Sequence, residues 1–159
     1  MEIHERLARA FPAIGMYRSE AATCHVQIAS LLNQMQRYPE SPWEYEQAVG
    51  LFERIPDPAL TDLYNLGCAH ARLAMPSDPA GSAPTPEEES NMRAHADQAM
   101  ATLRRAAAAG HKNVISLRAD PDLVPLRSRL DFRMLLFDVA FPDDPFAPFT
   151  VTSQAQPRP

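Results

Sequence analysis

The chain has 159 residues, 45% of them hydrophobic, which is enough for one domain with a buried core. Its formal net charge of -5 and its scarcity of lysine exclude the broad basic surface that nucleic acid requires. Two cysteines do not make a disulfide framework, and without an apolar run of membrane length or a secretory signal we expect no membrane partner and a cytoplasmic location.

Proline divides the chain into helical stretches. The 16 prolines lie mostly in four places, residues 39–42, 56–58, 76–86 and 142–159. The first predicted helix covers residues 2–10 and stops before Phe11-Pro12, because proline disfavours a helical residue before it. This helix has no N-cap signal. We therefore expect residues 1–16 to be either the end of a preceding repeat helix and a linker, in a chain whose array starts upstream, or a short N-terminal helix.

Residues 17–56 are predicted to form two antiparallel helices joined by a short turn. Ser19 and Glu20 favour the start of the first. Its apolar positions follow helical spacing and are expected to face the core: Cys24, Ile28, Leu31, Leu32 and Met35. After the break at 39–42 a second stripe follows, consisting of Tyr45, Ala48, Val49, Phe52 and Ile55.

Residues 57–110 repeat this pattern with an insertion. The third helix carries Leu63, Leu66, Gly67, His70 and Ala71, and the fourth carries Ala96, Ala99, Met100, Leu103, Ala106 and Ala107. Gly110 is predicted to end the fourth helix in the left-handed conformation. Between them, residues 76–91 are expected to form an exposed, mobile loop. The acidic run 87–89 belongs either to that solvated loop or to the first turn of the fourth helix.

Residues 111–142 are predicted to form closing helices. A short piece covers 113–119, and Asp120 with Pro121 starts the next one. Asp131 is expected to cap a last helix whose apolar residues are Phe132, Leu135, Leu136, Val139 and Ala140. The proline-rich tail 143–159 is expected to be ordered only in part.

The two helix pairs share small residues where helices must cross and large ones beside them. The small positions are Ala29, Ala48, Gly67, Ala99 and Ala106, and the large ones are Leu32, Tyr45 and Leu103. Helix axes only 8–10 Å apart leave room for little more than Gly, Ala or Ser. In this the chain resembles the tetratricopeptide repeat. The resemblance implies an all-α fold in which antiparallel pairs stack as a short right-handed solenoid with a C-terminal helical cap.

A second resemblance rests on three longer sequence segments. They are residues 62–71 (DLYNLGCAHA), residues 99–106 (AMATLRRA), and residues 120–127 (DPDLVPLR) followed by Asp131-Phe132. They are similar to the C-terminal repeat region of large bacterial Ser/Thr protein kinases of the planctomycete kind. The chain has no glycine-rich loop, HRD-type loop or DFG motif, so no catalytic residue is assigned and we expect no enzyme activity. An alternative role implied by the resemblance is the regulatory or substrate-positioning tail of such a kinase.

The expected function is a scaffold that binds a protein or peptide segment in the concave groove of the repeat. Candidate groove residues are Gln27, Asn33, Tyr64, Asn65 and Arg72, with His25 as a further candidate. The alternative for each of them is a solvent-exposed surface position with no binding role. The exposed edge of the first pair offers a surface for self-association. The arrangement of Cys24-His25, Cys68 and His70 does not suit zinc, so no metal or cofactor is predicted, and an unrecognised enzyme would need a cleft that the pattern does not reveal.

Overall fold

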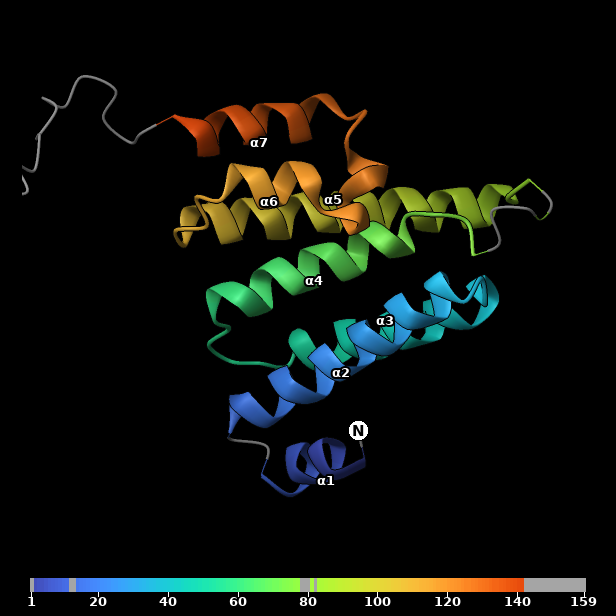
Figure 1. Ribbon diagram of the computed structural model, residues 1–159, viewed down its shortest axis with the longest axis vertical. Coiled ribbons are helices and arrows are strands. Elements are labelled where there is room, and N and C mark those ends of the chain that lie inside the picture. The colour runs from blue at the N-terminus through green and yellow to red at the C-terminus, as the bar shows by residue number, and fades with distance from the viewer. Residues whose placement is uncertain (1, 12–13, 78–80, 82, 142–159) are drawn as a thin grey trace, which may run out of the picture.

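The computed structural model describes residues 2–11, 14–77, 81 and 83–141, and these residues contain helices and no strand (Figure 1). The α-helices are α1 (Glu2–Ala10), α2 (Gly15–Gln34), α3 (Ser41–Phe52), α4 (Leu60–Leu73), α5 (Pro86–Ala108), α6 (Val114–Ala119) and α7 (Leu130–Ala140). Two 3₁₀ helices, η1 (Tyr38–Glu40) and η2 (Pro121–Leu126), lie between them. The predicted tail and residues 78–80 and 82 of the predicted loop lie outside the described residues.

The helices stack in chain order along the long axis, from α1 at one end to α7 at the other (Figure 1). Each of α1 to α4 packs against the next α-helix in the chain. One core lies between α2, α3 and α4, and its large buried side chains are Tyr45, Phe52 and Leu66. The other joins α4 and α5 to η2, α6 and α7 through Met100, Leu103, Leu117, Leu123, Leu126, Phe132 and Leu135. Burying one such side chain contributes roughly 1.5–3 kcal/mol.

Small residues stand where α4 crosses α5. A Cβ added to Gly67 would lie 2.8 Å from Cδ2 and 2.9 Å from Cγ of Leu103. Of the eight positions assigned from the sequence, seven are buried: Ala29, Tyr45, Ala48, Gly67, Ala99, Leu103 and Ala106. Leu32 is only half-buried and lies outside both cores.

The buried face of α2 differs from the prediction. Its buried residues are Ala21, Ala22, His25 and Ala29, whereas Leu31 and Met35 are 56% and 63% exposed. The small alanines allow α3 and α4 to approach closely, so the larger apolar side chains are left outside. The prediction that Ser19 starts this helix is also wrong. Ser19 lies inside α2 and its hydroxyl donates to Oδ1 of Asp62, at 2.5 Å.

Helix α5 begins earlier than predicted, so residues 86–91 are helical rather than part of the loop. Thr85 is the N-cap: its Oγ1 accepts from the backbone N–H of Glu88, and its own N–H donates to the Glu88 carboxylate at 2.7 Å. The acidic run 87–89 forms the first turn, at the positive end of the helix dipole. At the other end Gly110 has φ of 109°, which confirms the predicted left-handed cap.

The closing helices follow most of the sequence signals. Asp120 caps η2 by accepting from the N–H of Asp122 at 2.9 Å, as predicted. Asp131 does not cap α7, because the helix begins one residue before it and Arg129 is the N-cap. The Asp131 carboxylate instead accepts from Nε of Arg129 at 2.9 Å. Among the described residues, no helix combines the length and the apolar character that a membrane span needs.

Candidate functional site

A hollow of about 830 Å³ opens at the edge where α2 turns into α3 and where α4 leads into α5. This volume lies within the usual range for ligand pockets. Its wall on one side comes from η1 and the first turns of α3, and on the other from the first turns of α5. The polar residues that line it are Asn33, Tyr38, Ser41, Tyr45, Glu46, Arg72, Ser77, Thr85, Glu88, Asn91 and His95.

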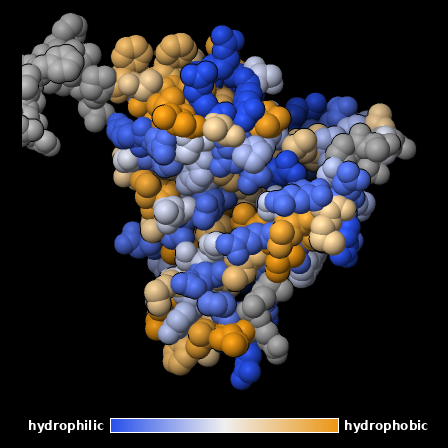
Figure 2. Space-filling model, in the orientation of Figure 1, coloured by the Kyte–Doolittle hydropathy of each residue, from blue (hydrophilic) through white to orange (hydrophobic). Residues whose placement is uncertain are grey.

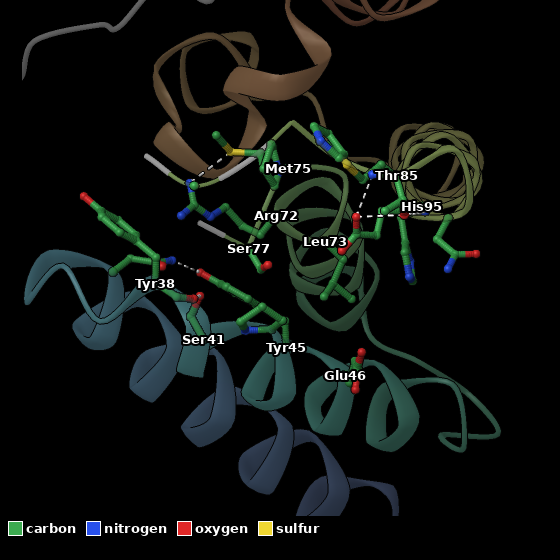
Figure 3. A pocket seen from close by; sticks show the side chains of 18 of the residues that line it. Tyr38, Ser41, Tyr45, Glu46, Arg72, Leu73, Met75, Ser77, Thr85 and His95 are labelled. Atoms are coloured by element: carbon green, nitrogen blue, oxygen red, sulfur yellow. Dashed lines mark hydrogen bonds between the residues drawn. The ribbon is translucent and has the colours of Figure 1, made fainter. Parts of the chain in front are cut away.

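Arg72 is the central cation of this hollow. Figure 3 shows its side chain reaching from α4 between Met75 and Tyr45. The guanidinium carbon lies 6.0 Å from the centre of the Tyr45 ring, and one terminal nitrogen donates weakly to the Met75 sulfur at 3.5 Å. Its Nε is buried and finds no hydrogen-bond acceptor among the described residues. Arg72 is therefore held in place with donor capacity left over.

One acidic residue, Asp122, lies close to this arginine. Asp122 Oδ1 lies 3.8 Å from Arg72 Nε, beyond hydrogen-bond distance. Burial and the nearby Asp120 raise the pKa of Asp122, and Arg72 opposes that rise. Burial also raises the pKa of Tyr45 to about 12, so its hydroxyl stays protonated and accepts a hydrogen bond from Nδ2 of Asn33 at 3.3 Å. The Arg72 guanidinium therefore has one weak ion pair, with Asp122, and lies beside the uncharged hydroxyl of Tyr45.

The structure brings two of the five candidate groove residues together. Asn33 and Arg72 both line the hollow, although they lie on different helices. Gln27 is exposed on α2 and Asn65 is half-buried on α4, and neither lines it. Tyr64 is used within the fold.

The Tyr64 hydroxyl donates to Oδ2 of Asp120 at 2.7 Å, and its ring stacks on His111 with centroids 4.6 Å apart. The hydrogen bond to Asp120, the N-cap of η2, links η2 to α4, and the two elements pack together. Burial, and then the hydrogen bond to Asp120, raise the pKa of Tyr64 well above its ordinary value. Cys68 belongs to the same cluster, because its sulfur lies 3.8 Å from Oδ2 of Asp120 and burial raises its thiol pKa. Such a thiol is unsuited to nucleophilic chemistry.

Several residues of the hollow were not predicted from the sequence. Tyr45 was assigned to packing alone, yet its hydroxyl reaches the hollow (Figure 3). Thr85 and Glu88 carry the Thr-x-x-Glu spacing of a capping box, a signal that would have placed the start of α5 and this wall of the hollow. For His95 no local signal exists.

His25 lies apart from the hollow in a buried polar contact. Its Nδ1 is 2.6 Å from Oε2 of Glu44, and the nitrogen donates because an ionised carboxylate only accepts. Its Nε2 lies 3.5 Å from Oε1 of Glu5, on α1. A smaller hollow of about 500 Å³ adjoins this pair, lined by Glu5, Ala8, Arg9, Arg18, His25, Trp43, Gln47, Leu51 and Arg54.

Buried His70 meets half-buried His95, with their Nδ1 atoms 3.1 Å apart. Burial, and then His95, lower the pKa of His70 to about 4, so it stays neutral near pH 7. Within the described residues, no three or more His, Cys, Asp and Glu side chains gather in a way that would hold a metal ion.

Comparison with family models, with curated proteins and with solved structures gives no match to this chain.

Proposed function

We propose that this chain is a protein-interaction module that binds an extended peptide in the hollow around Arg72, with a carboxylate of the peptide on the guanidinium. The single observation that carries the proposal is the guanidinium of Arg72 in the lining of a hollow of about 830 Å³, where it makes no hydrogen bond to a carboxylate of the described residues and lies 3.8 Å from Asp122. A guanidinium binds a carboxylate through two parallel hydrogen bonds.

The rest of the lining suits a peptide. Asn33, Ser41 and Ser77 offer amide and hydroxyl groups for a peptide backbone, while Leu73, Met75 and Met92 offer apolar contacts. Sites of this kind combine a mostly apolar wall with a few polar groups that fix orientation.

The finer architecture is part of the same proposal. We infer that the pairs α2/α3 and α4/α5 are tetratricopeptide-like units of a short right-handed solenoid, closed by α6, η2 and α7. The packing of α2 on α3, α3 on α4 and α4 on α5, together with the close approach of Gly67 to Leu103, supports this inference. In this arrangement the hollow lies at the edge formed by the turns of both units.

The test uses a pool of random heptapeptides with free C-terminal carboxylates and the same pool with amidated C-termini. We expect the carboxylate pool to shift backbone amide NMR signals around Asn33 and Arg72 at lower concentration than the amidated pool. Arg72→Gln, which keeps side-chain bulk and removes the charge, should weaken binding of a selected peptide about 10- to 100-fold, as expected for a charge-assisted hydrogen bond.

The matched control is Arg93→Gln. Arg93 lies on α5, outside the lining of the hollow, with a 70% exposed side chain that contacts only Glu89 among the described ion pairs. This variant should bind as the unmodified protein does. Equal affinity of the Arg72→Gln variant, or equal binding of both peptide pools, would contradict the proposal.

A further inference from the structure

The outer face of α7 carries a regular row of exposed apolar side chains. Leu130, Met134 and Phe137 on α7 are 70%, 57% and 64% exposed, and Phe141, the C-cap residue that follows the helix, is 60% exposed; we call these four residues the α7 stripe. Their spacing of four, three and four residues is that of the a and d positions of a coiled coil. Figure 2 shows apolar residues gathered at this end of the molecule.

The stripe lies opposite the face by which α7 joins its own domain. Phe132, Leu135 and Val139 are buried and belong to the core with α5 and α6. At 100° per residue their mean direction points roughly 160° away from that of the stripe. The helix is therefore already formed and anchored before anything covers its outer face, so a partner would not have to fold it.

The flanking charges identify the partner. In the heptad notation of coiled coils, Leu130 and Phe137 occupy d positions, and Met134 and Phe141 occupy a positions. Arg133 then occupies a g position and Asp138 an e position. Two parallel helices of the same sequence bring each g residue beside the e residue five positions later on the other helix. Arg133 and Asp138 have this separation, and both are exposed. A second copy in parallel register thus gains two ion pairs.

An antiparallel pair of the same helices lacks this complementarity. It would place g residues beside g residues and e residues beside e residues, so with position 137 opposite Met134 the Asp138 side chain would approach Asp131 of the second copy, while Arg133 would approach Ala140 and gain no ion pair. Like charges in such positions destabilise a pair. Charge thus favours the parallel arrangement.

From these observations we propose that the protein forms a parallel homodimer through the α7 stripe. At roughly 200 Å² for each large side chain, the four residues expose on the order of 500 Å² per copy, so a pair buries about 1,000 Å². This is near the lower limit for specific interfaces, and we expect a reversible dimer with a dissociation constant on the order of 10 µM. Because the stripe points away from the core, the two domains lie on opposite sides of the helix pair.

The experiment is sedimentation velocity on the full chain from about 1 to 200 µM, a range that brackets the expected constant. The unmodified protein should change from monomer to dimer. Phe137→Asp should weaken the dimer about hundredfold or more, because it places two carboxylates in an apolar seam. Its far-UV circular dichroism and melting temperature should stay unchanged, since Phe137 is 64% exposed.

Charge reversal tests the register. Arg133→Asp and Asp138→Arg should each weaken the dimer about tenfold, and the double variant should recover most of the loss because it restores both ion pairs in reverse. In a Cys24→Ser background, Phe137→Cys should yield a disulfide-linked dimer on oxidation, since parallel d residues face each other. An antiparallel pair would instead place position 137 against Met134.

Leu31→Asp is the control that separates this surface from the exposed edge of α2, where the sequence predicts self-association. Leu31 is 56% exposed and lies on the first helix pair. Its variant should dimerise normally. A protein that stays monomeric throughout, a dimer lost in Leu31→Asp but kept in Phe137→Asp, or no recovery in the double charge variant would overturn the proposal.

Discussion

Gly67→Ala and Gly50→Ala form a matched pair that tests how closely α4 crosses α5. Both glycines lie inside helices, where alanine is favoured over glycine by about 1 kcal/mol. A Cβ on Gly50 meets nothing within 4 Å, so Gly50→Ala should raise the free energy of unfolding by about 0.5–1 kcal/mol. A Cβ on Gly67 would lie within 2.9 Å of Leu103 Cγ, and Leu103 is itself fully buried. Overpacking of this kind costs about 1–3 kcal/mol, so Gly67→Ala should be less stable than the unmodified protein by about 1 kcal/mol.

The assay is urea denaturation followed by circular dichroism, with both variants and Leu103→Ala in the same buffer. Leu103→Ala alone should cost about 2–5 kcal/mol through the cavity it leaves. In that background Gly67→Ala should become stabilising by about 1 kcal/mol, because the clashing atoms are gone and the helix preference remains. If Gly67→Ala and Gly50→Ala stabilise the unmodified protein equally, the close crossing described here is wrong.

Three further predictions concern single side chains. The folded protein binds a proton on His70 only near pH 4, while the unfolded chain does so near pH 6.5, so stability should fall as the pH drops through this interval, by at most about 3 kcal/mol. Urea midpoints at pH 7.5 and 4.5 measure this, and His70→Gln should flatten the difference; an equally steep loss in the variant would assign it to other groups. Thr85→Ala removes the N-cap of α5 and should speed amide exchange in residues 86–90 about fivefold, the equivalent of about 1 kcal/mol. Tyr64→Phe removes the hydrogen bond to Asp120 and should cost about 1–2 kcal/mol in thermal unfolding, whereas an unchanged melting temperature would mean that this bond is replaced by water.

Local sequence signals predicted the helices and most of their ends well. Gly110 stops α5 because only a residue without a Cβ readily takes a positive φ, and Asp120 caps η2 because its short carboxylate reaches the N–H two residues on. The burial of Tyr45 and Leu103 followed from helical spacing alone. These are properties of a few neighbouring residues, so a single sequence contains them.

The buried face of α2 could not be predicted from hydropathy. His25 faces the core, and burying its polar ring is possible because its N–H donates a hydrogen bond to Glu44, a residue nineteen positions away in the sequence. The alanines beside it fit because α3 comes close, which leaves Leu31 and Met35 outside. Both facts depend on the approach of separate helices.

The hollow could not be predicted from the sequence either, because it too depends on how separate helices pack together. Asn33 and Arg72 were named as candidates on separate helices, but their meeting depends on how α2, α3 and α4 are inclined to one another. A pattern read along one helix does not contain that angle.

The unequal lengths of α4 and α5 have a consequence for how the hollow varies. Helix α5 has 23 residues and α4 has 14, so α5 is longer than its neighbour by roughly 13 Å, and Figure 1 shows it passing the end of α4. The buried residues of α5 begin at Ala99, whereas the wall of the hollow comes from the exposed turns before it. The core and the wall of the hollow therefore occupy separate lengths of one helix, so under the proposed function substitutions over residues 86–94 would change what the hollow accepts without disturbing the buried core.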